Sequence, residues 1–154
     1  MGRVKFDLRS AKSKIKRFKK DSKVELREKL EEEIKANISS GNSPVKGMGR
    51  YQQYSDSYKS AIKKGSYRQF GKRSRPVNLI LSGELIESLS VKVTNKGLKV
   101  SFDNELADIH NRKGAGKSKT IRRMLPTKNG EEFNRSITTR LKEVLAKVAS
   151  KIFR

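Results

Sequence analysis

Apolar residues near the end of the chain recur at steps of three and four positions, which places them on one face of an α-helix. The stripe consists of Phe133, Ile137, Leu141, Val144, Leu145, Val148 and Ile152. Glu131 and Glu132 are expected in the first turn of this helix, where the positive end of the helix dipole favours carboxylates. The pattern predicts a C-terminal helix whose apolar stripe packs against a sheet.

A second helical stripe lies in the first third of the chain. Its members are Val24, Leu26, Leu30, Ile34 and Ile38. Ser22 is the expected N-cap of this helix, and Gly41 provides a stop signal. Before it, Val4, Phe6 and Leu8 alternate with polar residues, which predicts a short, half-buried strand.

The middle of the chain carries the period of two that is typical of β-strands. Val91 and Val93 alternate with polar residues, residues 95–97 form a turn that ends in glycine, and the alternation resumes from Leu98 to Phe102. This segment therefore predicts a β-hairpin.

Shorter helical elements flank the hairpin. A short helix is expected around Leu85 and Leu89 and another turn between Glu105 and His110. The region between Gly41 and Pro76 has no usable period and is expected to be a long loop with a helical turn near residues 55–64. The chain is thus predicted to be α+β: a small antiparallel sheet packed against a long helix of the N-terminal half and a C-terminal helix, with long basic loops.

Composition excludes several classes of protein. The 154 residues include no cysteine and one histidine, so disulfides, Cys/His zinc sites and cysteine nucleophiles are excluded. No apolar run approaches the roughly 18 to 20 residues that span a bilayer, and the basic N-terminus lacks the apolar core of a signal peptide. The chain is expected to be soluble, not secreted and without a membrane partner.

The net charge of +22 is concentrated in segments expected to be arms or loops. Residues 1–23 hold ten Lys/Arg against two acids, residues 40–83 nine against one, and residues 112–130 seven against none. Cations on projecting segments are typical of proteins that contact a polyanion, because each neutralised phosphate releases counterions. The alternatives are a solvated surface or pairing with acidic neighbours in an assembly.

The stretch KGAGKSKT, residues 113–120, contains the Gly-Lys-Ser that ends a nucleotide-binding P-loop. Asn111 stands where the motif needs its first glycine, and the residues that follow are a poor start for a helix. We expect a flexible cationic loop without nucleotide chemistry.

Catalytic residues are not apparent either. His110 lies beside Asp108 without an identifiable nucleophile or orienting partner. Asp103, Glu105 and Asp108 are the only cluster of carboxylates near a basic segment, and two of them are plausible caps of a helix. The sequence predicts no enzyme activity, no cofactor and no metal.

Several short strings together resemble one protein family. They are GNSPVKG at 41–47, the tyrosines that follow it, PVNL and LSGEL within 76–85, the surroundings of His110, and LPTKNGEEF at 125–133. Their order over about residues 24–154 is similar to that of neck or tail-completion proteins of tailed bacteriophages. The resemblance implies a single domain over 24–154, preceded by a basic arm at 1–23.

The family resemblance also implies an assembly. Its members form homo-oligomeric rings, often six-fold, between the capsid portal and the tail, and the genome passes through the bore. The implied partners are further copies of the chain, other neck, connector or tail proteins, and genomic DNA without sequence specificity. The implied location is the virion neck, assembled in the host cytoplasm.

Within the domain, the resemblance assigns structural roles to a few residues. Leu79, Leu81, Leu85 and Leu89 would pack a joint between helix and strand, Ser82 and Gly83 would form its turn, and residues 125–127 would redirect the chain into the C-terminal helix.

Two sets of residues are candidates for contacts outside the subunit. The candidate polyanion contacts are Lys12, Lys14, Lys16, Arg17, Lys19, Lys20, Lys113, Lys117, Lys119, Arg122 and Arg123. The candidate subunit interface consists of Tyr51, Tyr54 and Tyr58, since aromatic residues are frequent anchors at interfaces. A free-standing, non-specific nucleic-acid-binding protein is the alternative function.

Overall fold

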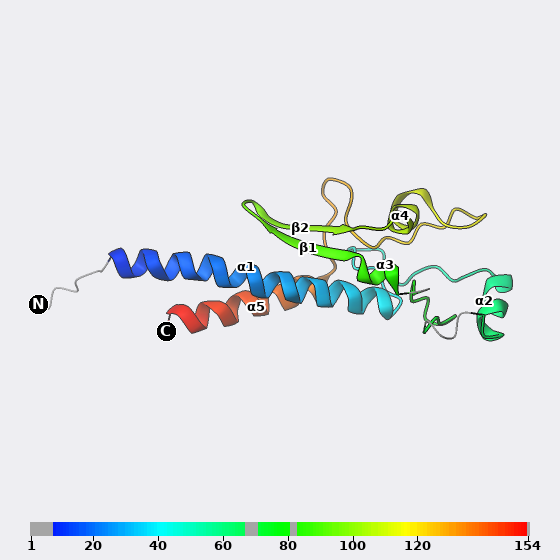
Figure 1. The fold of residues 1–154 in the computed structure, drawn as a ribbon, viewed down its shortest axis with the longest axis horizontal. Coiled ribbons are helices and arrows are strands. Elements are labelled where there is room, and N and C mark those ends of the chain that lie inside the picture. Colours follow the sequence, from blue (N-terminus) through cyan, green and yellow to red (C-terminus); the bar gives the residue numbers. More distant parts are fainter. Residues whose placement is uncertain (1–7, 67–70, 81–82, 154) are drawn as a thin grey trace, which may run out of the picture.

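A computed structural model describes residues 8–66, 71–80 and 83–153. The helices are α1 (Leu8–Ser39), α2 (Asp56–Lys63), α3 (Glu84–Glu87), α4 (Glu105–Asp108), a π-helical turn (Ile109–Lys113) and α5 (Arg135–Phe153); the strands are β1 (Leu89–Thr94) and β2 (Gly97–Phe102). The predicted α+β class is confirmed. In Figure 1, α5 runs beside α1, the hairpin lies over another side of α1, and the short helices gather at the far end from both termini.

Helix α1 begins much earlier than the apolar stripe predicted. The expected N-cap, Ser22, is wrong: this residue lies inside the helix and is only 6% exposed. The predicted boundary between arm and domain at residue 23 therefore falls within one continuous helix. Contacts near its start explain the extension, because Phe18 packs against Phe153 of α5 with ring centroids 5.7 Å apart. The helix ends as predicted, just before Gly41, whose φ of 82° favours glycine.

The predicted N-terminal strand is not supported. Leu8 is the first residue of α1, and Val4 and Phe6 lie outside the described residues.

The core lies around α1, which packs against α5 on one side and against the hairpin on another, so the apolar stripe of α5 contacts mainly α1 and not the sheet as predicted. Ile34 and Ile38 of α1 and Ile137 of α5 have no exposed surface. The predicted hairpin is confirmed, with Val91 paired to Val100 in an antiparallel register. Residues of β1 and β2 that share a face with Val91 turn toward α1, and the alternate residues face away. A single apolar layer between the hairpin and α1 thus fixes the sheet.

The start of α5 differs from the expected one. The helix begins at Arg135, and Asn134 caps it by accepting a hydrogen bond from the Ile137 amide at 3.1 Å. Glu131 and Glu132 precede the helix, so their predicted place in its first turn is wrong. The Glu131 carboxylate instead accepts two backbone amides, from Thr127 at 2.7 Å and from the next residue at 3.0 Å, and holds a turn.

The short helices occur close to their predicted positions. Helix α2 forms within residues 55–64, and α3 follows Gly83. Leu79, Leu85 and Leu89 are buried as the resemblance implied; Leu81 and Ser82 lie outside the described residues. The cap of α4 is neither of the neighbouring acids but Asn104, whose side chain accepts the Leu106 amide at 2.9 Å.

Within the described part of the chain, no helix is long and apolar enough to cross a membrane.

Candidate polyanion-binding surface and buried tyrosine cluster

The Gly-Lys-Ser loop is a tight turn closed by its own backbone hydrogen bonds. Ala115 and Thr120 pair through two backbone hydrogen bonds, of 2.8 and 3.0 Å. Gly114, with φ of 83°, allows this turn, because a Cβ on it would lie 2.1 Å from the Lys119 carbonyl oxygen. The loop follows a π-helical turn, and residues 121–134 form no helix after it. This context confirms that the segment lacks the strand-to-helix geometry of a P-loop.

The five candidate cations of this loop divide into two groups. Lys117 and Lys119 are exposed at the tip, and Lys113 is exposed although its amine lies 3.0 Å from the Asp108 carboxylate. Arg122 and Arg123 turn inward. Lys117 and Lys119 therefore form the exposed cationic tip of the loop, and Lys113 is an exposed cation at its base.

The prediction that Arg122 contacts a polyanion is wrong, because the residue is only 5% exposed. Its guanidinium donates to the Gln52 carbonyl oxygen through two nitrogens, each at 3.2 Å, and lies 5.1 Å from the centre of the Tyr54 ring. Arg122 thus joins the end of the basic loop to the residues around Tyr51. A phosphate outside the subunit cannot reach it without displacing these contacts.

Arg123 is also engaged within the subunit. Its side chain is 10% exposed, donates to the Thr127 hydroxyl at 2.5 Å and lies 3.5 Å from the Glu131 carboxylate. Since Glu131 holds the turn at 127–128, Arg123 stabilises the bend that leads toward α5.

The tyrosines predicted at a subunit interface belong largely to the subunit's own core. Tyr51 and Tyr54 are 5% and 8% exposed, which corrects their assignment as anchors between subunits. Tyr58 is half-buried and contacts Tyr54 edge to face, with ring centroids 5.0 Å apart. The Lys72 amine donates to the Tyr54 hydroxyl at 2.7 Å. Residues far apart in sequence therefore converge on Tyr54.

We call this group the tyrosine cluster; its members are Tyr51, Tyr54, Tyr58, Lys72, His110 and Arg122. It brings two cations into a partly desolvated space. Burial, with a smaller contribution from the nearby Arg122 charge, lowers the pKa of Lys72 to about 8. Burial also lowers the pKa of Arg122 and raises the pKa of Tyr54 to about 12.

The cluster holds its histidine neutral. Burial first, then the charges of Arg122 and Lys72, lower the pKa of His110 from 6.5 to about 4. The His110 Nδ1 atom and the Tyr51 hydroxyl are both buried without a hydrogen-bond partner among the described residues. An imidazole with so low a proton affinity is a poor general base near neutral pH.

The carboxylates considered for metal binding do not form a site. Asp108 is paired with Arg112 and Lys113, and these cations lower the pKa of its carboxyl. Asp103 and Glu105 are exposed. In the residues that the structure covers, no group of three or more potential ligands is placed to hold a metal ion.

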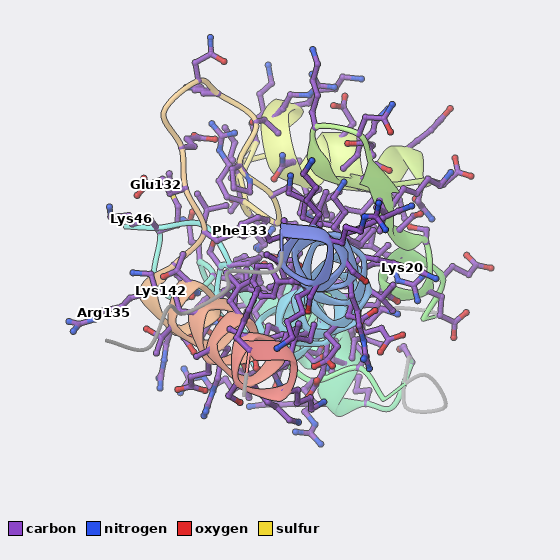
Figure 2. All side chains as sticks on the ribbon, turned by 90° about the vertical axis from the view of Figure 1, so that its left-hand side faces the viewer. Lys20, Lys46, Glu132, Phe133, Arg135 and Lys142 are labelled. Carbon is purple, nitrogen blue, oxygen red and sulfur yellow. The ribbon has the colours of Figure 1, made fainter. Side chains whose placement is uncertain are left out.

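The candidate cations of residues 12–20 all lie on the first half of α1 and are exposed. Arg17 forms a 3.4 Å ion pair with Asp21; the five lysines of this set form no ion pair within the described ranges. Figure 2 views the molecule toward the N-terminal end of α1. Lys20 lies on the side of α1 away from α5, whereas Arg135 and Lys142 project from the α5 side.

Comparison of the chain with protein-family models, with curated proteins and with solved structures found no match.

Proposed function

We propose that this chain is a structural, non-enzymatic virion protein of a tailed bacteriophage. In this proposal it forms part of the neck or tail-completion ring that joins the tail to the DNA-filled head. The observation that carries the proposal is the placement of the cations: the lysines of the first half of α1 and of the loop tip are exposed on projecting elements. Such a surface suits DNA that passes by or acidic surfaces of neighbouring subunits.

The strings that resemble neck proteins support the same proposal, because they meet in one joint. Gly41 packs so closely on Pro76 that an added Cβ would lie 2.7 Å from the proline side chain. Val45 pairs with Phe133 in an isolated antiparallel bridge. The end of α1, the entry to the long loop and the entry to α5 are therefore tied together by residues of these strings. Their roles here are structural, which fits a subunit whose function is assembly.

The proposed partners are further copies of the chain in a ring, six-fold by the resemblance, other neck, connector or tail proteins, and genomic DNA without sequence specificity. Base reading is not part of the proposal, since the cations engage phosphates by charge alone. The proposed location is the virion neck. Tyr51 and Tyr54 have no part in the proposed subunit contacts, because both are buried within one subunit.

Light scattering coupled to size-exclusion chromatography at low and high salt tests assembly, with electron microscopy of the same fractions. The proposal expects discrete rings that persist at high salt. Rings that form only when tail or connector proteins are added also agree with it. A chain that stays monomeric with those partners and binds nucleic acid tightly would instead support the free-standing nucleic-acid-binding alternative.

A further inference from the structure

One face of α1 changes its chemistry halfway along the helix. Successive residues of an α-helix are about 100° apart, so steps of three, four, seven and eleven residues return to nearly the same face. Leu30, Ile34 and Ile38 lie on one such face, and all three are buried. Continuing this face toward the N-terminus gives Arg27, then five lysines (Lys23, Lys20, Lys19, Lys16 and Lys12) and finally Arg9.

The hairpin ends where this change occurs. Its last strand pair is Thr94 with Gly97, and the Lys23 amine donates to the Thr94 carbonyl oxygen at 3.0 Å. Beyond this contact α1 continues without the hairpin above it (Figure 1). The lysines therefore lie on the extension of the covered apolar face, directly past the hairpin tip, where exposed Lys96 adds a further charge.

Apart from the Lys23 contact with the hairpin, these lysines form no ion pair that would stabilise the described part of the fold. Lys12 and Lys16, Lys16 and Lys20, and Lys19 and Lys23 are each four residues apart, a spacing at which like charges on a helix repel. Lys12, Lys16, Lys19 and Lys20 have no acidic partner in the described part of the subunit. Because no acid within the described part of the subunit offsets the repulsion between these lysines, an anion outside the subunit would stabilise them.

The same helix makes a nucleic acid a better partner than a membrane. A helix that lies in a membrane surface needs an exposed apolar face beside its cations. In α1 no such face forms: Phe18 is packed against Phe153, and the exposed Ile15 and Val24 lie singly on opposite flanks of the lysines. The lysine face contains no apolar residue, and residues 12–23 extend along the helix for about 16 Å at 1.5 Å per residue. Several phosphates of one DNA strand fit along that length.

We infer that Lys12, Lys16, Lys19, Lys20 and Lys23 of α1, together with Lys96 at the hairpin tip, form one surface for the phosphate backbone of duplex DNA. We call it the α1–hairpin surface. It excludes Lys14 and Arg17, which point to other sides of the same helix. The inference takes its partner from the proposed function and is independent of ring formation.

Two double variants with equal loss of charge test this surface. Lys16→Gln/Lys19→Gln removes two cations from the surface, and Lys14→Gln/Arg17→Gln removes two from the same stretch of helix on other sides. Binding of a fluorescently labelled duplex, in two unrelated sequences, is measured by anisotropy over a salt titration. Circular dichroism confirms that each full-length variant is folded.

The surface variant should bind more weakly at low salt, and its salt dependence should be shallower by roughly 0.9 log units for each phosphate that is no longer neutralised. The control variant should keep the slope of the wild type, and Lys96→Gln should make the slope shallower by at most the value of one phosphate. Equal changes in the two double variants, or no change in either, would overturn the inference.

Three further outcomes distinguish a failure of this inference from a failure of the proposed function. A chain that forms rings but does not bind duplex DNA overturns the α1–hairpin surface and leaves the neck assignment standing. Binding to vesicles of phosphatidylserine and phosphatidylcholine, without binding to DNA, overturns the surface in favour of a membrane. A chain that forms no rings even with tail or connector proteins, but binds DNA through this face, contradicts the neck assignment alone.

Discussion

Acid should destabilise this protein through one residue, His110. The chain has a single histidine, and its surroundings lower its pKa from 6.5 to about 4. A folded-state pKa below the unfolded one means that the unfolded chain binds more protons between these two pH values. The stabilising effect of the neutral imidazole is therefore complete above pH 6.5 and is lost as the pH falls toward 4.

The magnitude follows from the same two values. A tenfold difference in proton affinity is worth ~1.4 kcal/mol, so the full difference would cost about 3 kcal/mol below both pKa values. His110 is only half-buried, and solvent screening reduces the figure. We expect a loss of about 1 kcal/mol in the free energy of unfolding between pH 7 and about pH 5.

Urea unfolding at pH 7 and near pH 5, followed by circular dichroism, measures this loss. The carboxyls of Asp108, Glu131 and Glu132 have lowered pKa values, so their contributions are lost only below their ordinary values of 3.8 to 4.5. The window between pH 5 and pH 6.5 therefore isolates the histidine. His110→Gln is the matched control, because it keeps a neutral polar side chain that does not titrate.

The variant should lose much less stability than the wild type over this window. NMR of the one imidazole should show its titration near pH 4. An equal decline in wild type and variant, or an imidazole that titrates near 6.5, would refute the reasoning that places His110 in a desolvated, cationic environment.

Three other predictions concern the buried cluster and the basic loop. Tyr51→Phe should leave the free energy of unfolding in urea unchanged or raise it by up to about 1 kcal/mol, because the Tyr51 hydroxyl has no partner among the described residues. Tyr51→Ala should lower the free energy of unfolding by about 3 kcal/mol or more, because it removes a buried ring. Similar losses in the two variants would contradict this prediction. ATP with magnesium should not raise the melting temperature, and a rise that Lys117→Ala abolishes would restore the P-loop interpretation. Replacing Lys113, Lys117 and Lys119 with Gln should change stability by less than about 0.5 kcal/mol, and a clear fall in melting temperature would show that these side chains support the fold.

Much of the fold was readable from periodicity, because it depends on local pattern. The apolar alternation around Val91 predicted the hairpin, and the stripe through Ile137 and Val148 predicted α5. The sequence pattern misses the start of α1 because the first half of the helix is rich in lysine and arginine and carries no apolar stripe. The contacts of that half, such as Phe18 with Phe153 of α5, join residues that lie far apart in the sequence.

The candidate site was predictable only in part. The density of cations was plain from sequence, and the exposed lysines of α1 and of the loop tip agree with it. The sequence could not show that Arg122 turns inward, because its acceptor, the Gln52 carbonyl, is separated from it by 70 residues of chain. Nor could it place Lys72 beside Tyr54, since no motif links them. Tertiary contacts between loops determine these orientations, and the local sequence does not predict such contacts.

The proposal that the protein joins phage tails to filled heads is best tested by counting particles in electron micrographs. Particles are produced by a phage that carries this gene with a stop codon near its start, with and without the protein supplied in trans. We expect DNA-filled heads and separate, complete tails when the protein is absent, and joined, infectious particles when it is supplied. Intact, infectious particles in its absence, or heads that fail to fill with DNA, would rule out this function.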